Sequence, residues 1–195
     1  MRTNKHCGFT LVETLVAVGL FAIVTTIASS AFLAMVNADR VSRSVRIATD
    51  NLSLALEDMS RRIKTGTTYA CGGGNGTQDC PLASGGGGSL AFYDQNGPRI
   101  GYKRGVGSDC GSLYTATQGC VLRQSVSASS VSPWTPTTSH EIDIINLKFV
   151  VGGSSSADAI QPYVVISIEG SIGTPPKPVT KFKMQTMVTQ RQLDL

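Results

Sequence analysis

The chain has an uninterrupted apolar segment near its N-terminus. It runs from Phe9 to Val36 and contains a single charged residue, Glu13. As an α-helix with a rise of about 1.5 Å per residue, a segment of this length would span a bilayer core. A carboxylate inside such a span costs about 2.5–3.5 kcal/mol at the membrane centre and less near an interface. We therefore expect Glu13 to have a partner.

The apolar segment continues into an amphipathic one. Its apolar positions recur every three or four residues: Val41, Val45, Ala48, Leu52, Leu56, Met59 and Ile63. This spacing is typical of a helix with one apolar face. No Pro or Gly lies between Val36 and Lys64, and Gly66 is a suitable helix stop. The pattern predicts one helix from about Thr10 to Thr65.

The rest of the chain predicts short strands separated by Gly- and Ser-rich loops. The turn Gln95-Asn96-Gly97-Pro98 lies between two partly alternating runs and predicts a hairpin. Polar and apolar residues alternate over 181–187, which indicates a sheet with one buried face that the amphipathic helix would cover. The predicted strands are Ser89–Asp94, Arg99–Arg104, Cys120–Val126, Glu141–Val151, Tyr163–Glu169 and Val179–Val188.

These elements predict an α+β fold, in which a long N-terminal helix packs on an antiparallel β-sheet domain. The helix is hydrophobic all round in its first part and amphipathic in its second part. The expected divisions are a short basic segment at 1–8, a membrane-spanning segment at 9–36, an amphipathic half at 37–66 and a globular β domain at 67–195.

The net charge gives no reason to expect nucleic-acid binding. Lys and Arg number 17 against 13 Asp and Glu, and removal of Arg2 and Lys5 with residues 1–8 would leave 15 against 13. No basic cluster follows, so nucleic acid is not an expected partner. Arg40, Arg43 and Arg46 follow the apolar segment. They form either a solvated helix face or a contact with lipid headgroups or neighbouring subunits.

Four of the five cysteines lie beyond the apolar segment, at Cys71, Cys80, Cys110 and Cys120. An even number on the far side of a membrane span indicates disulfides. Of the three connectivities, the short loops favour 71 with 80 and 110 with 120. Each bond would contribute about 2–3 kcal/mol and mainly rigidify a surface loop. Neither pair has the two-to-four-residue gap of zinc ligands, so no metal is expected.

Catalytic motifs are absent from the sequence. The chain has two glycine-rich stretches, at 72–76 and 85–88. Neither is followed by Lys-Ser/Thr, as a phosphate-binding loop requires, and no Ser lies in a G-x-S-x-G context. Beyond the basic leader, His140 is the only histidine on which a hydrolase triad could be built. We expect no enzymatic activity and no cofactor.

The stretch Gly8-Phe9-Thr10-Leu11-Val12-Glu13 resembles the processing site of type IV prepilins and type II secretion pseudopilins. The similarity lies in the small residue before the cut, the aromatic residue after it and the acid four residues further on. It implies a pilin-like fold, cleavage of the leader 1–8 by prepilin peptidase between Gly8 and Phe9, and N-methylation of the new terminus at Phe9. Gly8 is needed because the peptidase accepts almost nothing larger at that position.

The resemblance also implies a role for Glu13. In a filament, its carboxylate would pair with the positively charged amine of Phe9 on a neighbouring subunit. A buried polar pair of this kind sets the register between subunits. The alternative is that Glu13 pairs with the amine of its own chain.

A structural subunit of a type IV pilus or type II secretion-like filament is the implied function. Its layout resembles that of a minor subunit such as the J-type pseudopilin, with a major pilin as the alternative. The implied partners are other pilin or pseudopilin subunits, prepilin peptidase, the inner-membrane assembly platform and, before assembly, the lipid bilayer. The precursor would cross the inner membrane once with its β domain outside the cytoplasm, and would then join a filament at the cell surface or in the periplasm.

Two interpretations from another class stay open. Ala28-Ser29-Ser30 offers an ordinary signal-peptidase site, which would release a secreted binding domain that starts near Ala31. An uncleaved membrane anchor would instead display the β domain as an adhesin.

Overall fold

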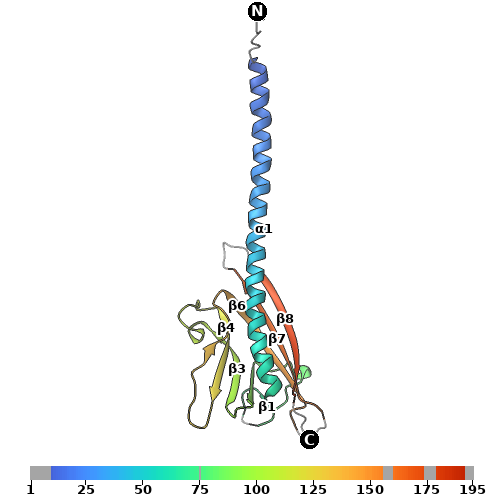
Figure 1. Cartoon of the computed structure of the whole chain (residues 1–195), viewed down its shortest axis with the longest axis vertical. Coiled ribbons are helices and arrows are strands. Elements are labelled where there is room, and N and C mark those ends of the chain that lie inside the picture. The colour runs from blue at the N-terminus through green and yellow to red at the C-terminus, as the bar shows by residue number, and fades with distance from the viewer. Residues whose placement is uncertain (1–9, 75, 156–159, 174–178, 192–195) are drawn as a thin grey trace, which may run out of the picture. The chain divides into compact units, whose positions relative to one another are not determined.

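A computed structural model describes residues 10–74, 76–155, 160–173 and 179–191. The chain forms two compact units, Met1–Arg43 and Ser44–Leu195. One helix, α1 (Leu11–Thr65), continues from the first unit into the second (Figure 1). The observed ends of α1 confirm the predicted helix of about Thr10 to Thr65, and the α+β fold class is confirmed as well.

The part of α1 in the second unit buries one apolar stripe, as its spacing predicts. The buried residues are Ala48, Leu52, Ala55, Leu56, Met59 and Ile63. Val45, which was expected on the same face, is 42% exposed, so the buried face begins at Ala48. The exposed faces of this part of the helix carry charges such as Glu57 and Arg61.

Gly66 directly follows the helix, at a position where a side chain would not fit. A Cβ at this position would lie 2.5 Å from the ring of Phe92. The hydroxyl of Tyr69 lies 2.6 Å from the carbonyl oxygen of Ile63 and 2.8 Å from that of Gly66, and can donate to either. The carbonyl of Ile63 also accepts the N–H of Gly66 at 3.1 Å, so the hydroxyl of Tyr69 adds a second donor at the end of the helix.

The first sheet has five antiparallel strands in the order β1-β2-β3-β4-β5. The β2–β3 hairpin closes through Gly97, which has a φ of +95°. The bounds are β1 Thr67–Cys71, β2 Ser89–Tyr93, β3 Arg99–Val106, β4 Gly119–Val126 and β5 Thr135–Pro136, with 3-10 turns η1 at Leu82–Ser84 and η2 at Gly107–Cys110. The sequence did not predict β1 or β5; β5 falls in 125–139, a Ser-rich stretch expected to be a loop.

The second sheet has three antiparallel strands in the order β6-β7-β8. They are β6 Ile142–Gly152, β7 Tyr163–Ile172 and β8 Thr180–Thr189 (Figure 1). Glu169 on β7 lies opposite Lys183 on β8, and the two side chains form an exposed ion pair at 2.6 Å. Hydrogen bonding to Lys183 and its positive charge lower the pKa of Glu169.

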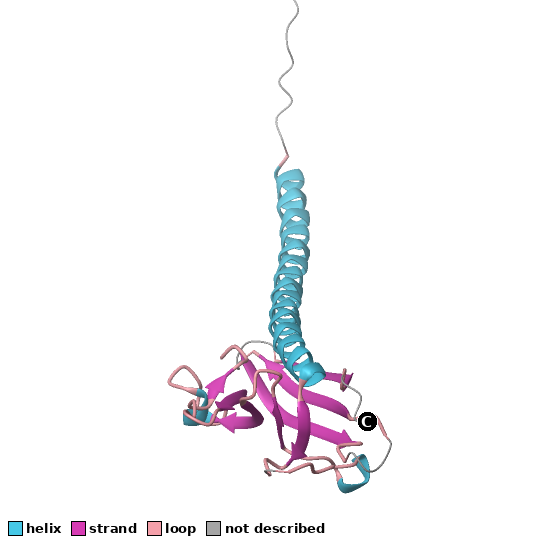
Figure 2. Ribbon diagram, turned by 60° about the horizontal axis from the view of Figure 1, so that its bottom comes forward, coloured by secondary structure: helices cyan, strands magenta, loops and turns pink. Residues whose placement is uncertain are grey.

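The predicted antiparallel β domain thus consists of two sheets that share one core. The core cluster joins the stripe of α1 to inward side chains of both sheets, among them Phe92, Tyr102, Phe149 and Ile166. Figure 2 shows the C-terminal turns of α1 lying over the strands. Phe182 and Met184 of β8 pack against this cluster, and the predicted alternation of β8 is confirmed.

Strand β6 contains a β-bulge. Its pairing with β7 shifts register between Ile144 and Asn146, and the extra residue Ile145 is 49% exposed. Ile142 and Ile144 are buried before the bulge, and Leu147, Phe149 and Val151 are buried after it. The bulge thus returns the odd-numbered residues to the face that the even-numbered residues occupied.

Candidate functional site

Glu13 is the predicted assembly residue that the structure describes, whereas Gly8 and Phe9 lie outside the described residues. Glu13 occupies the first turn of α1. The side-chain oxygen of Thr10 accepts the backbone N–H of Glu13 at 3.3 Å, and the carbonyl of Thr10 accepts the N–H of Thr14 at 3.2 Å. Thr10 is therefore the N-cap, and Glu13 is the third residue of the helix.

The sequence Thr10-Leu-Val-Glu13 is a capping box, a signal that sequence reasoning missed. In this motif a Ser or Thr N-cap is followed three residues later by Glu or Gln. A carboxylate in the first turn also interacts favourably with the positive end of the helix dipole. Helix initiation at Thr10 thus places Glu13 at the start of the apolar span, and no ion pair between described residues includes it.

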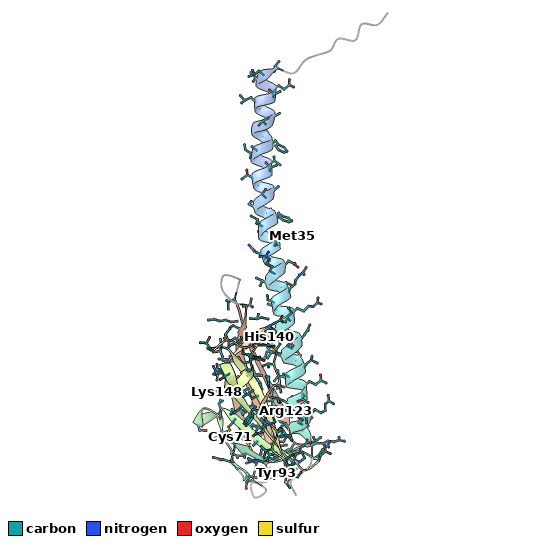
Figure 3. All side chains as sticks on the ribbon, turned by 90° about the vertical axis from the view of Figure 1, so that its left-hand side faces the viewer. Met35, Cys71, Tyr93, Arg123, His140 and Lys148 are labelled. Atoms are coloured by element: carbon teal, nitrogen blue, oxygen red, sulfur yellow. A yellow bond between two sulfur atoms is a disulfide. The ribbon has the colours of Figure 1, made fainter. Side chains whose placement is uncertain are left out.

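Most of the apolar span has its side chains exposed in the isolated chain. Leu15 is 68% exposed, Phe21 69% and Met35 74% (Figure 3). The span is long and apolar enough to cross a membrane. Such a large exposed apolar surface needs an apolar environment or another protein surface to cover it.

The hydroxyl groups in the span are satisfied within the helix. Thr25, Thr26 and Ser29 donate to the carbonyls of residues four positions earlier, at 2.6, 2.7 and 2.7 Å. Their polarity is thereby compatible with an apolar environment. Gly19, which could weaken a helix, lies within the continuous helix α1.

The structure joins Cys71 to Cys80 and Cys110 to Cys120, the pairing that the short loops favour. The described residues of the loop that the first bond closes are exposed, but the bond itself is buried. Cys71 and Cys80 belong to the main core and are 3% and 9% exposed. A Cβ at Gly87 would lie 2.1 Å from the sulfur of Cys71, so only glycine fits beside this bond.

The Cys71–Cys80 disulfide lies where the first sheet meets the second. Cys80 and Val151 exchange backbone hydrogen bonds of 3.0 and 3.3 Å, and Gly87 and Phe149 exchange two of 2.8 Å. These four bonds connect β6 to segments that flank β1 and β2. We call this region the seam, defined by Cys71, Cys80, Gly87, Phe149 and Val151.

The Cys110–Cys120 disulfide holds a second, smaller cluster with Leu122, Tyr114 and Trp134. The loop that it closes, residues 111–119, is attached to the start of β6. The amide of Gln118 donates to the carbonyl of His140, and the N–H of Gly119 donates to the carboxylate of Asp143 at 2.8 Å. This disulfide therefore positions a loop beside residues 140–143.

Asp58 connects the amphipathic part of α1 to the first sheet. Its carboxylate accepts Arg62 Nε at 3.0 Å and Arg123 Nη1 of β4 at 3.1 Å, with the hydroxyl of Tyr102 at 3.5 Å. Burial, followed by the charge of Asp58, raises the pKa of Tyr102. Figure 3 shows Arg123 beside the helix. The spacing of Asp58 and Arg62 was visible in the sequence, but the contact with Arg123 was not.

Comparison with known proteins gives one match. Residues 3–29 match the family model of the prokaryotic N-terminal methylation motif. The chain carries that motif. It includes Gly8, Phe9 and Glu13, and it is consistent with a type IV prepilin or pseudopilin. No curated protein and no solved structure matches the chain.

The methylation motif supports two coarser conclusions. It is the motif of structural pilin subunits, not of enzymes, which confirms the expectation that the protein is not an enzyme. With the apolar start of α1, it fits a precursor that is anchored in the inner membrane and processed by prepilin peptidase, and that associates with other pilin subunits.

Proposed function

We propose that the protein is a structural subunit of a type IV pilus or type II secretion-like filament, which polymerises through the apolar part of α1. The observation that carries the proposal is the combination at the N-terminus. A methylation motif at 3–29 precedes an apolar helical span whose side chains are exposed and whose acid lies in the first turn. The span would lie in lipid before assembly and among the spans of other subunits afterwards.

Cleavage between Gly8 and Phe9 would create the group that Glu13 needs. The new terminus at Phe9 is an amine, which stays positively charged after methylation at neutral pH. A carboxylate and an amine that are both removed from water cost less as a pair than apart. Pairing between the amine of one subunit and Glu13 of its neighbour would therefore favour one axial offset.

The apolar side chains of the span would be covered by apolar surroundings both in lipid and in the filament. Both surroundings are apolar, so packing and polar pairs would decide the association. The assembly platform in the inner membrane would supply the work of extraction. Because Glu13 is the only charged residue of the span, its pairing would distinguish one axial offset between subunits from another.

The β unit would lie outside the cytoplasm. Two disulfides in this unit are consistent with an oxidising compartment. Within the filament family, the multi-stranded unit behind a long helix favours a minor subunit of J-type layout, with a major pilin as the alternative.

The mature N-terminus is the first test. Intact mass and N-terminal sequencing of the protein from membranes or sheared filaments should give a chain that starts at N-methyl-Phe9. A start near Ala31 would instead support a secreted binding domain, and a start at Met1 an anchored adhesin. Either result would overturn the filament proposal.

Replacement of Glu13 tests the assembly step separately from processing. Glu13→Ala should still be cut and methylated, but its incorporation into filaments should fall by at least about tenfold, as is typical when one partner of a buried charge pair is removed. Glu57→Ala is the matched control, because Glu57 is an exposed acid further along the same helix. Normal incorporation of Glu13→Ala would exclude the proposed role.

A further inference from the structure

A small pocket of about 160 Å³ lies on the outer face of the first sheet. Strand β3 contributes Arg99, Gly101 and Lys103 to it, and these residues alternate with the core residues Ile100 and Tyr102. Because successive side chains of a strand point to opposite faces, the three residues face away from the core. All the described lining residues belong to the second unit, so the pocket is formed within one compact body.

One side of the pocket is formed by Trp134, the only tryptophan of the chain. Its ring lies close to β3 because Gly101 has no side chain there: a Cβ would lie 3.1 Å from the ring. Trp134 also packs against the smaller cluster of Cys110, Cys120 and Leu122, and it stays half-buried. The indole is therefore held in place while part of its surface faces the pocket.

Two positively charged side chains line the pocket. The ammonium of Lys103 lies 4.4 Å from the centroid of the Trp134 ring, and no ion pair between described residues includes it. The guanidinium of Arg99 donates to the carbonyls of Gly73 and Gly74, which holds it beside the loop that follows β1. Both cations are thus positioned by contacts with neutral groups.

Negative charge is absent from the described part of the lining, which includes no Asp or Glu. The undescribed residue closest in sequence to a lining residue is Asn75, whose side chain is uncharged. A pocket that is lined by cations of one sign attracts a ligand of the opposite sign. The charge therefore favours an anion.

The rest of the lining suits a sugar ring. An indole presents a flat apolar surface on which the C–H groups of a pyranose can pack, and amide and hydroxyl groups bind sugar hydroxyls. Gln124 supplies the amide and Ser89 the hydroxyl. The amide of Gln124 donates to the carbonyl of Ser132 at 3.0 Å, which holds it in place. Pockets for drug-sized ligands measure about 300–1,000 Å³, so this one has room for a single ring.

Nucleic acids and acidic peptides match the pocket less well. Single-stranded nucleic acid needs a positively charged groove that follows its backbone, with aromatic side chains for successive bases. The described lining offers two cations and one tryptophan, which is enough for one anionic ring. An acidic peptide side chain would use the cations but has no ring to cover the indole. The combination favours a sugar that carries its own carboxylate.

We propose that the pocket formed by Arg99, Lys103, Gln124 and Trp134 binds a uronic acid unit of an acidic polysaccharide. The sugar ring covers the indole where the ammonium of Lys103 lies in the isolated chain, and the ammonium pairs with the sugar carboxylate instead. A cation–π contact at an exposed site is weak, so this exchange costs little. The inference goes beyond the proposed filament function and does not depend on it.

Fluorescence of Trp134 tests the binding, because the ligand covers the only tryptophan. The full-length chain in detergent is titrated with tetragalacturonate, which should give a saturable change in emission. The methyl-esterified tetramer is the matched ligand, since it keeps the rings and loses the charge. It should bind at least about tenfold more weakly, as loss of a charged hydrogen bond implies. No saturable change, or equal binding of the two tetramers, would overturn the inference.

Two further probes decide the class of ligand. Oligothymidylate and a tetra-aspartate peptide both carry negative charge but contain no uronic acid. At the same ionic strength, each should bind more weakly than tetragalacturonate, because neither combines a single anionic ring with hydroxyl groups. If oligothymidylate binds as tightly or more tightly, the pocket is a nucleic-acid site. The same result with tetra-aspartate would make it a peptide site, and either outcome contradicts the sugar.

Lys103→Gln tests the charge that selects the ligand. The variant should bind tetragalacturonate at least about tenfold more weakly, with no change in its affinity for the methyl ester. Lys148→Gln is the control, because Lys148 is an exposed lysine of the second sheet (Figure 3). The urea midpoint shows that each variant is folded. Full affinity of Lys103→Gln for tetragalacturonate would exclude the proposed pairing.

Trp134→Leu tests the indole surface. Leucine keeps an apolar side chain on the smaller cluster but gives no flat surface for the sugar, so both tetramers should bind more weakly. Calorimetric titration replaces fluorescence for this variant, since the fluorophore is lost. Unchanged affinity for both tetramers would show that the ring does not contact the sugar.

The two proposals of this protein's function fail independently. A mature chain that starts near Ala31 or at Met1 overturns the filament proposal and leaves the pocket unaffected. Failure of tetragalacturonate to bind overturns the pocket inference, and the filament function then stands on the methylation motif and Glu13.

Discussion

The two parts of α1 use the same apolar residue types with opposite results. In the apolar span, Leu15, Phe21 and Leu33 are 63–69% exposed. In the amphipathic part, Leu52, Met59 and Ile63 are at most 1% exposed. The second part is covered by sheets of its own chain, and the first has no such cover among the described residues. A single helix thus serves folding at one end and association at the other.

The sharpest way to test this difference is to place a lysine in each part. Leu20→Lys should abolish stable membrane insertion and filament incorporation, since a lysine near the centre of a span costs about 2.5–3.5 kcal/mol. Leu54→Lys, at a position that is 68% exposed, should change stability by less than about 0.5 kcal/mol. Membrane fractionation and filament yield measure both. Equal effects would show that the two parts do not differ as described.

Truncation of a leucine to alanine should have its larger effect in the amphipathic part, the opposite of the lysine substitutions. Leu52→Ala should lower the free energy of unfolding of the β unit by about 2–5 kcal/mol, because Leu52 is fully buried. Leu15→Ala should leave that free energy unchanged. Urea denaturation of the processed chain in detergent, followed by fluorescence of the single Trp134, provides the measurement. An unaltered midpoint for Leu52→Ala would contradict the packing of the stripe.

Removal of the seam disulfide tests the sheets that cover the stripe. By loop entropy alone, loss of either disulfide should lower the free energy of unfolding by about 2–3 kcal/mol. The double variant Cys71→Ala/Cys80→Ala should lose more than Cys110→Ala/Cys120→Ala, because the first bond also packs in the main core. The same denaturation experiment ranks the two variants. Equal losses would mean that the seam adds nothing beyond loop closure.

The smallest effect is expected at Tyr102, whose pKa is raised in the folded state by burial and by Asp58. A raised pKa means that the folded form favours the neutral phenol. Its contribution is therefore complete below a pH of about 10, the ordinary tyrosine value, and is lost progressively at higher pH. Tyr102→Phe should change stability by less than about 1 kcal/mol at neutral pH.

The pH dependence of that variant gives the check. Wild type should lose more stability than Tyr102→Phe between pH 8 and pH 11, measured as the difference in urea midpoints. An identical alkaline loss in both proteins would show that Tyr102 does not titrate as its surroundings imply.

Local patterns predicted the helix and the longer strands because their information is contiguous. The spacing from Ala48 to Ile63 and the alternation in β8 each lie within one segment. β1 escaped prediction because Thr67–Cys71 follows the helix after one residue and contains Thr68 at a φ of +56°. β5 has two residues, one of them Pro136, and carries no periodicity.

The contacts between distant segments were not predictable in the same way. Nothing in the sequence around Gly87 indicates that it pairs with Phe149, or that Asp58 meets Arg123 from β4. The division into two sheets follows from such contacts. Of the candidate site, Gly8, Phe9 and Glu13 were found from adjacent residues, whereas the seam combines residues that lie far apart in the sequence.

The bulge in β6 has a consequence for length variation. Because Ile145 is the unpaired extra residue, its deletion would convert β6 into a regular strand and keep every buried side chain on the same face. Deletion of Val150 would instead turn Val151 outward and disturb the pairing with β7. Within β6, the place where the chain can shorten without exchanging inside for outside is the bulge.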